Sequence, residues 1–325
     1  MVNLNKSDTT DHLDRIASKY EPKIEQGLLA AFEKIKSGII LSELEGLIVT
    51  GGISAVLAKL GDLEKIIGKE IRDTLIDAVA EGGRAVIGQL PKKAILETYT
   101  FDMLDQGVIR EFKNHYVRLV SDISMGTRKV VVDQLEANII AGVNPIKAAR
   151  DIRDSIGLTQ IQNQAVSNFR ASLESGDISS ALKNTLRDKR FDKLLSSAKK
   201  KDKPISQEKI DKMVDRYRER TLKYRAETVA RTEAMRAISM GEFESLKQAY
   251  DEGSMQVELL RFWVATLDER TRWSHKGMPK LNKDGVGIDQ PFKTPRGNLL
   301  RYPRDPNAPP EEVVNCRCRL IYKVV

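Results

Sequence analysis

The stretch from Arg261 to Leu320 constrains the fold more than any other part of the chain. It contains both tryptophans, both cysteines, one of the three histidines and seven of the eleven prolines. Proline lacks a backbone donor and fixes φ, and glycine favours turns, so a single long helix is excluded here. The two ends, RFWVAT and CRLIYKVV, are rich in aromatic and β-branched residues and are typical of strands. The pattern therefore predicts a compact α+β module whose first and last segments pair.

Four side chains of this stretch belong to the types that bind zinc in tetrahedral sites: Asp268, His275, Cys316 and Cys318. Pairing of the two ends would bring them together as an internal clamp of the module. A metal ion would also help to stabilise a unit with a small hydrophobic core. The sequence is thus compatible with a structural zinc site, although C-x-C is a less typical zinc spacing than C-x-x-C.

A metal-free network is the alternative for the same residues. Asp268 would then pair with Arg270 or Arg272, Asn315 would cap a turn, and the two thiols would pack inside the module. A disulfide between such close cysteines is strained, so no disulfide framework is expected. This favours a reducing compartment of origin.

Outside this module the chain is expected to be mainly helical. Its hydrophobic content of 41% and charged content of 31% are those of a soluble globular protein, and apolar residues recur at helical spacing. We predict three consecutive regions: an N-terminal helical region at 1–104 that contacts a partner, a helical domain at 105–250, and the small α+β module at 251–325.

Glycine and proline mark the expected helix boundaries. Gly142 is expected to end one helix, and Asn144-Pro145 to begin the next with an N-cap followed by proline at the first helical position. The pair Gly82-Gly83 is expected to end a helix in the same way.

The most apolar window of the chain is GLIVTGGISAVLA, at 46–58. It is shorter than the ~20 residues that a membrane-spanning helix needs, so no membrane span is expected. A buried core helix or a helical hairpin would account for it. Contact with a membrane surface or with a groove on another protein is the alternative.

The net charge of +8 is unevenly distributed along the chain. The segment 183–225 contains 16 Lys and Arg against 7 Asp and Glu. Such a segment can bind the phosphates of double-stranded DNA without sequence preference. The alternative is a solvated helix face, because opposite charges four residues apart, such as Glu208 and Lys212, support an exposed helix. The candidate DNA contacts are Lys199, Lys200, Lys201, Lys203, Arg216, Arg218 and Arg220.

Three motifs in the second half of the chain follow one another in a recognisable order. ARTEAMR at 230–236 is followed by W-x4-D-x-R-T-R-x-x-H and finally by N-C-R-C. Together they resemble the phage Mu protein F-like head morphogenesis family, which includes minor head proteins of tailed bacteriophages. The residues that carry the resemblance are Arg231, Thr232, Glu233, Trp263, Asp268, Arg270, Thr271, Arg272, His275, Gly277, Phe292, Tyr302, Pro303, Asn315, Cys316, Arg317 and Cys318.

The resemblance implies a virion component present in few copies, made in the cytoplasm of a bacterial host and located at the portal vertex or in the capsid interior. It implies the portal protein and the capsid interior as partners, with an oligomer on the portal, and a role in head assembly and in DNA binding or delivery. The helix that carries ARTEAMR is expected to dock against the C-terminal module. The predicted docking residues are Arg231, Thr232, Glu233, Trp263, Arg270, Arg272 and Asn315.

An enzyme carried in the virion is the opposing class of function. His275 and Cys316 could form the base and nucleophile of a metal-dependent or thiol-based hydrolase. Arg231 with Glu233 could indicate a toxin-like, nucleotide-modifying activity. No oxyanion loop, carboxylate cluster or phosphate-binding glycine loop accompanies these residues, so a non-enzymatic role is expected.

Overall fold

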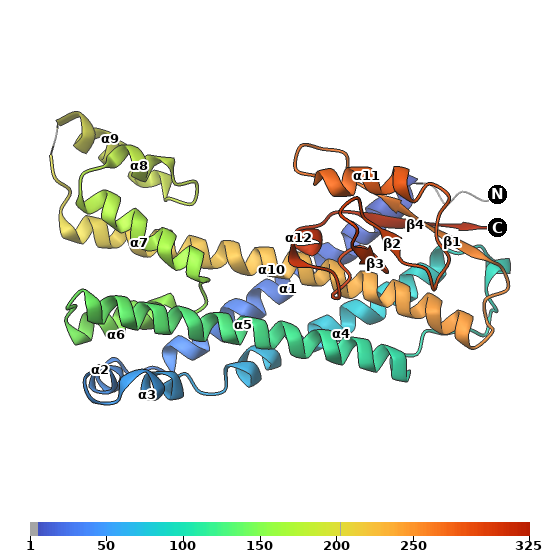
Figure 1. Ribbon diagram of the computed structural model, residues 1–325, viewed down its shortest axis with the longest axis horizontal. Helices are drawn as coiled ribbons and strands as arrows, with labels where there is room; N and C mark the ends of the chain where they lie inside the picture. The colour runs from blue at the N-terminus through green and yellow to red at the C-terminus, as the bar shows by residue number, and fades with distance from the viewer. Residues whose placement is uncertain (1–5, 202) are drawn as a thin grey trace. The chain divides into compact units, whose positions relative to one another are not determined.

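The computed structural model describes residues 6–201 and 203–325. The first five residues of the predicted N-terminal region and residue 202 of the basic segment lie outside the described residues. Helices dominate the described chain, and the strands are confined to its C-terminal part (Figure 1), which confirms the predicted fold class.

The helices and strands have the following bounds in chain order. The N-terminal half contains α1 (Lys6–Ser37), α2 (Leu41–Thr50), α3 (Gly52–Lys59), α4 (Leu63–Gln89), the 3-10 turn η1 (Lys92–Ala94), α5 (Gln106–Ile140) and α6 (Pro145–Ser155). Then come α7 (Gln160–Glu174), α8 (Ile178–Lys183), η2 (Lys189–Phe191), α9 (Asp192–Lys201) and α10 (Gln207–Asp251). The C-terminal part contains β1 (Leu259–Val264), α11 (Trp273–Leu281), β2 (Phe292–Lys293), β3 (Leu299–Leu300), α12 (Pro310–Val313) and β4 (Arg319–Val324).

The chain divides into two compact units that are discontinuous in sequence. Unit 1 comprises Met1–Gln26, Ile71–Arg118 and Glu227–Val325, and unit 2 comprises Gly27–Glu70 and Leu119–Ala226. The long helices α1, α4, α5 and α10 each contribute residues to both units. The units therefore do not coincide with the predicted regions 1–104 and 105–250, although the module at 251–325 lies wholly in unit 1.

The two ends of the C-terminal module pair as the sequence predicted. β1 and β4 run antiparallel, with Leu259 opposite Val324 and Trp263 opposite Leu320. Alternate residues of β1 are buried, which is the pattern of a strand with one face on a core. The short strands β2 and β3 form a second antiparallel pair inside the module.

In unit 1, α4 and α10 approach each other closely at glycines. A Cβ atom on Gly82 would lie 2.3 Å from the carbonyl oxygen of Ile238, and one on Gly241 would lie 1.9 Å from that of Val79. A Cβ on Gly83 would lie 2.1 Å from the ring of Phe101. The prediction that Gly82-Gly83 ends a helix is wrong, because these glycines make room for neighbouring atoms inside a continuous α4.

In unit 2, the predicted helix boundaries at Gly142 and Asn144 are confirmed. Gly142 has a φ of 61°, and the side chain of Asn144 accepts the N–H of Ile146 at the start of α6. The apolar window at 46–58 covers the end of α2 and most of α3, and in it Val56 is buried and Val49 is exposed. No helix in the described part of the chain is long and apolar enough to cross a membrane.

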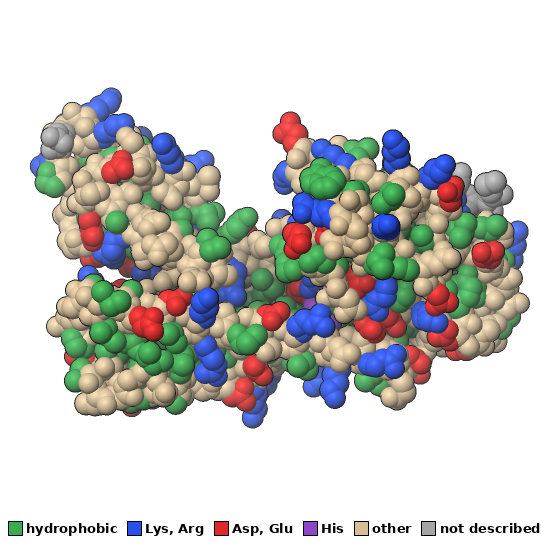
Figure 2. Space-filling model, viewed as in Figure 1, with side chains coloured by type: hydrophobic (Ala, Val, Ile, Leu, Met, Phe, Trp, Pro, Cys, Tyr) green, Lys and Arg blue, Asp and Glu red, His purple; other side chains and the backbone are tan. Residues whose placement is uncertain are grey.

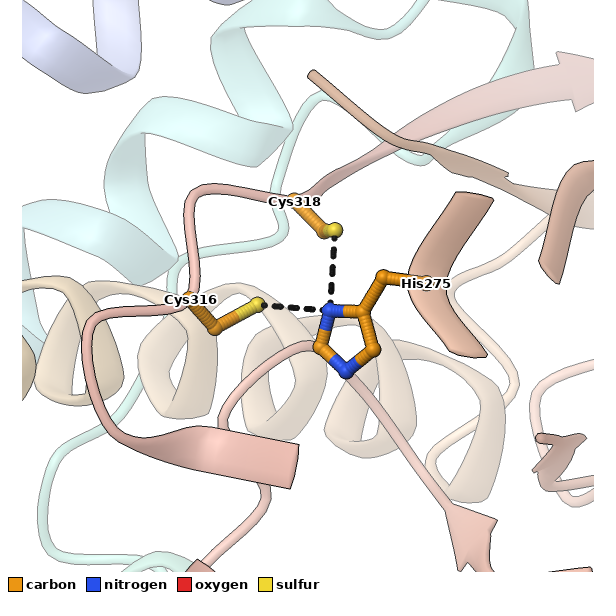
Figure 3. A group of neighbouring side chains, drawn as sticks. All are labelled: His275, Cys316 and Cys318. Atoms are coloured by element: carbon orange, nitrogen blue, oxygen red, sulfur yellow. Dashed lines mark hydrogen bonds between the residues drawn. The ribbon is translucent and has the colours of Figure 1, made fainter. Parts of the chain in front are cut away.

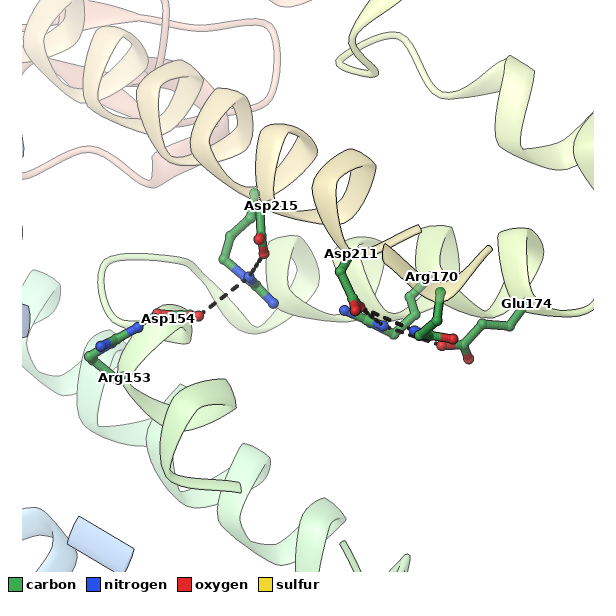
Figure 4. A network of polar contacts seen from close by, with 8 residues as sticks. Arg153, Asp154, Arg170, Glu174, Asp211 and Asp215 are labelled. Atoms are coloured by element: carbon green, nitrogen blue, oxygen red, sulfur yellow. Dashed lines mark hydrogen bonds and ion pairs between the residues drawn. The ribbon is translucent and has the colours of Figure 1, made fainter. Parts of the chain in front are cut away.

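The basic segment folds around its own core in unit 2. Buried side chains from α7, α8, α9 and the start of α10 form one cluster, in which Phe169 stacks on Tyr217 with ring centroids 4.6 Å apart. Arg170 of α7 is ion-paired with Asp211 of α10 at 2.7 Å and with Glu174 at 3.2 Å (Figure 4). These contacts hold α7 and the start of α10 together.

Candidate metal centre in the C-terminal module

Three of the four predicted clamp residues meet inside the module. His275 lies on α11, and Cys316 and Cys318 lie on the segment that leads into β4, so the pairing of β4 with β1 positions both thiols. Nδ1 of His275 lies 3.5 Å from Sγ of Cys316 and 3.3 Å from Sγ of Cys318 (Figure 3). All three side chains are buried, with 2 to 4% of their surface exposed.

Glu312 fixes the orientation of the imidazole. Its Oε2 lies 3.0 Å from Nε2 of His275 and also accepts the hydroxyl of Ser274, while its Oε1 accepts the amide of Asn298. The carboxylate is fully buried. When Nε2–H donates to Glu312, the lone pair of the ring is on Nδ1 and faces the two sulfurs. In the sequence, only its proximity to Cys316 indicates a role for Glu312.

The three donor atoms fit a tetrahedral metal ion. Zinc binds sulfur at about 2.3 Å and nitrogen at about 2.1 Å, so a tetrahedral angle places the two donors about 3.6 Å apart. The sulfur–nitrogen distances of 3.5 and 3.3 Å are close to this value. The donor atoms of His275, Cys316 and Cys318 all lie within 4.8 Å of one another. These residues would hold such an ion with a structural role, and a fourth ligand would come from outside this group.

The two thiols have opposite protonation preferences. A hydrogen bond from Cys318, with smaller contributions from His275 and Arg304, lowers the pKa of the Cys316 thiol well below its ordinary value. The same hydrogen bond, together with burial, raises the pKa of the Cys318 thiol. The contact between the two sulfurs thus favours a thiolate within the pair, and thiolate is the form of cysteine that binds metals.

Arg304 fixes the segment that carries the two cysteines. Its guanidinium is fully buried and donates to the carbonyl oxygens of Cys316 and Cys318, each at 2.9 Å, and to the hydroxyl of Ser239 at 2.7 Å. Its backbone has a φ of 68°. Because Ser239 belongs to α10, this arginine joins the clamp to the long helix within unit 1. Nothing in the sequence distinguishes Arg304 from the other arginines of the module.

Asp268 does not belong to the thiol–imidazole group, and its predicted place in the clamp is wrong. Its carboxylate accepts hydrogen bonds of 2.6 and 2.7 Å from Arg317, and others from Thr271 and the backbone of Arg270. The bonds from Arg317, with smaller contributions from the others, hold the pKa of Asp268 well below its usual range. Arg317 lies between the two cysteines in the sequence, so its side chain faces away from the inward thiols and pairs with the carboxylate.

The other predicted docking residues of the module lie around this centre. The ring of Trp263 is perpendicular to that of His275, with centroids 5.8 Å apart. Arg272 donates to the carbonyl oxygen of Val314, while the guanidinium of Arg270 is exposed and 4.0 Å from Asp268. Neither arginine is the main partner of Asp268 that the metal-free alternative required.

The three residues of the ARTEAMR motif have different partners. The hydroxyl of Thr232 accepts the backbone N–H of Asn315 at 3.1 Å and thus contacts the module directly. Glu233 is buried between His115 and Arg236, and Arg236 donates to the carbonyl oxygen of Arg304 at 2.9 Å. Arg231 is exposed instead, and its Nε lies 3.8 Å from Glu21 of α1.

Comparison with known proteins assigns these motifs to a family. The family model for Phage Mu protein F like protein matches residues 129–321, which is more than half of the chain. The chain belongs to this family. It is also similar to minor head protein GP7 of Bacillus phage SPP1, with 34% identity over 100 residues. These residues cover 31% of this chain and only 30% of that relative, so the similarity spans less than a third of its length. No solved structure gives a significant match.

Within the matched family segment, the candidate DNA contacts fall into two groups. Lys199, Lys200 and Lys201, in the last turn of α9, and Lys203 are exposed. Figure 2 shows Lys and Arg side chains around α8 and α9. The side chain of Arg216 is also about half exposed (52%), although it pairs with Glu219.

The remaining two arginines are already bound within unit 2. Arg218 is 15% exposed and pairs with Asp215 at 2.9 Å and with Asp154 at 3.6 Å; both aspartates are labelled in Figure 4. Arg220 donates to the carbonyl oxygen of Arg187. The guanidinium of Arg218 is therefore part of the packing of unit 2, and the exposed lysines are centred on the end of α9.

Proposed function

We propose that this protein is a minor head protein of a tailed bacteriophage that acts in head assembly at the portal vertex and in binding or delivering packaged DNA. The observation that carries the proposal is the family match over residues 129–321, which includes the whole candidate metal centre. The similarity to a minor head protein over 100 residues supports the same role. In this proposal the protein lies inside the capsid or at the portal, bound to the portal protein as an oligomer.

The proposed location is tested by comparing particles. Mass spectrometry of purified virions and of empty procapsids should detect the protein in both, at low copy number relative to the major capsid protein. Cross-linking of procapsids should join it to the portal protein. Its absence from both kinds of particle would contradict the proposal.

The proposed DNA contact is the exposed lysine cluster Lys199–Lys201 with Lys203. Lysines that neutralise phosphates release counterions, so affinity for unrelated duplexes should fall steeply as salt rises. Charge reversal in Lys199→Glu/Lys200→Glu should weaken binding at least roughly tenfold at low salt. The matched control is Lys92→Glu/Lys93→Glu, an exposed pair in unit 1. Equal loss in both variants, or binding that does not respond to salt, would count against this surface.

We propose a structural rather than a catalytic role for the thiol–imidazole group. The side chains of His275, Cys316 and Cys318 have at most 4% of their surface exposed, so a substrate would have no access to them. Cys316→Ser and His275→Ala should then impair folding. A variant that remains folded but loses turnover of a substrate would instead support the alternative of a virion enzyme.

A further inference from the structure

A cavity in unit 1 is lined by the start of α5, the last turns of α10 and the loop around Asp289. Acidic side chains outnumber basic ones in its lining. Its volume is about 510 Å³. Six carboxylates and three basic side chains line it. It is separate from the thiol–imidazole group, and its lining residues were not among the predicted site residues.

Five of these six carboxylates already have partners. Asp105 accepts the backbone N–H groups of Gly107 and Val108 at the start of α5. Glu111 is ion-paired with Arg301: Nη2 of Arg301 donates to Oε2 at 3.1 Å, and Nη1 lies 3.1 Å from Oε1. The other three carboxylates are at exposed positions and also have partners. Asp251 and Asp289 pair with Lys247, and Glu252 accepts a hydrogen bond from the hydroxyl of Ser254.

Glu244 is the exception among them. Its side chain lines the cavity and the residue is 6% exposed, yet it makes no hydrogen bond or ion pair within the described chain. A Cβ on Gly107, which also lines the cavity, would lie 3.8 Å from its Oε2. Burial raises the pKa of Glu244 to about 7, and the nearby Arg301 and Arg110 offset only part of this effect. A further cation beside the carboxylate would favour its charged form.

The geometry points to a primary alkylammonium group as the ligand of this cavity, with Glu244 as its counter-ion. A compact ammonium has three donors and can pair with this single carboxylate. The alkyl chain behind the charge would pack on Phe243 and Ile288, which line the same cavity. Lys247, whose ammonium lies between Asp251 and Asp289, is bound in a similar way at the rim.

A directly coordinated metal ion is less suitable for this cavity. Such an ion needs several oxygen ligands around one point. In the described part of the chain, the thiol–imidazole group is the one set of three or more His, Cys, Asp or Glu donors that lie close enough to share an ion. No three carboxylates of the cavity therefore lie close enough to coordinate one ion together.

The ammonium could belong to a free polyamine or to a lysine side chain of a partner protein. Isothermal titration of the full chain at low salt tests the shared chemistry with 1,5-diaminopentane, with 1,5-pentanediol as the uncharged control. We expect the diamine to bind and the diol not to bind. Spermidine and a lysine blocked at both its amino and carboxyl groups separate the sources: tighter spermidine binding indicates a polyamine, and equal or tighter binding of the blocked lysine indicates a side chain.

Glu244→Gln removes the charge with little change in shape, and Glu97→Gln, at an exposed position of unit 1, is its matched control. We expect Glu244→Gln to weaken diamine binding at least roughly tenfold and Glu97→Gln to leave it unchanged. Circular dichroism verifies that both variants are folded. The proposal would be overturned if the unchanged protein and Glu244→Gln bound the diamine equally well, or if the diol bound. It would also be overturned if magnesium displaced the diamine by more than the effect of ionic strength.

Discussion

At the scale of single residues, buried charged groups position the reactive side chains of the module. Glu312 orients His275, and Arg304 holds the backbone around both cysteines. Partners of this kind belong to one structural unit with the groups that they orient, although they are distant in sequence. The role of such a partner can be tested by a substitution that removes its charge and retains the shape of its side chain.

Replacing Glu312 by Gln should lower the affinity of the module for zinc. The amide keeps the size of the side chain but no longer accepts a charge-assisted hydrogen bond from Nε2–H, so the imidazole becomes a weaker ligand. Loss of such a partner costs roughly 10- to 100-fold in metal affinity. Zinc competition against a chromogenic chelator measures it. The control is Glu311→Gln, at the neighbouring exposed position, which should have no effect.

Burial of Glu242 should make the stability of the protein depend on pH. The residue is 3% exposed, and burial raises its pKa to about 8, against a smaller opposite effect of Arg304 and Arg319. The folded protein thus binds this proton more tightly than the unfolded chain, in which the pKa is near 4.5. The contribution of Glu242 to stability is present below about pH 4.5 and is lost as pH rises through about 8.

Glu242→Gln should remove this dependence. At about pH 8.5 we expect the free energy of unfolding of the variant to exceed that of the unchanged protein by roughly 2 kcal/mol. This is less than the full shift of the Glu242 pKa would give at ~1.4 kcal/mol per pKa unit. The difference should become small at about pH 5. Urea unfolding at both values measures it. A difference that is the same at both pH values would show that the carboxyl does not titrate in this range.

At the scale of elements, the sequence identified the strands but misjudged one helix. The ends of the module were predictable because β-branched and aromatic residues prefer strands, and the β1–β4 pair confirms this. The role of Gly82-Gly83 could not be predicted from the sequence. A glycine that ends a helix and a glycine that lets a neighbouring helix pack closely can have the same local sequence. The decisive neighbour, Ile238, is far away in the chain.

The crossing of α4 and α10 gives a prediction about these glycines. Gly241→Ala would place a Cβ 1.9 Å from the carbonyl oxygen of Val79, so the helices must separate. We expect a loss of about 2–3 kcal/mol in the free energy of unfolding, as for other overpacked contacts. The control is Gly88→Ala in α4, where nothing lies within 4 Å of the new Cβ. It should be neutral or stabilising by up to about 1 kcal/mol in chemical denaturation.

At the scale of the whole molecule, the sequence predicted the family and most of the clamp, but not the division into units. His275, Cys316 and Cys318 stood out by residue type, and they meet because the module folds back on itself. Asp268 pairs with Arg317 instead, which the sequence does not show, because Arg270 and Arg272 carry the same charge and are nearer in the chain. The division into units could not be predicted from the sequence. Hydrophobic periodicity indicates which face of a helix is buried, but it does not indicate which distant segment packs on that face.

The discontinuity of unit 1 predicts that its parts do not fold separately. Residues 232–246 of α10 are buried at every position, and the module at 251–325 contributes contacts such as Arg304 with Ser239 and Asn315 with Thr232. A chain ending at residue 252 would expose this helix, so we expect it to aggregate. Co-expression with 253–325, which breaks the chain beside the exposed Gly253, should restore a soluble complex that co-purifies. A soluble fragment 1–252 that unfolds at the same temperature as the full chain would contradict the prediction.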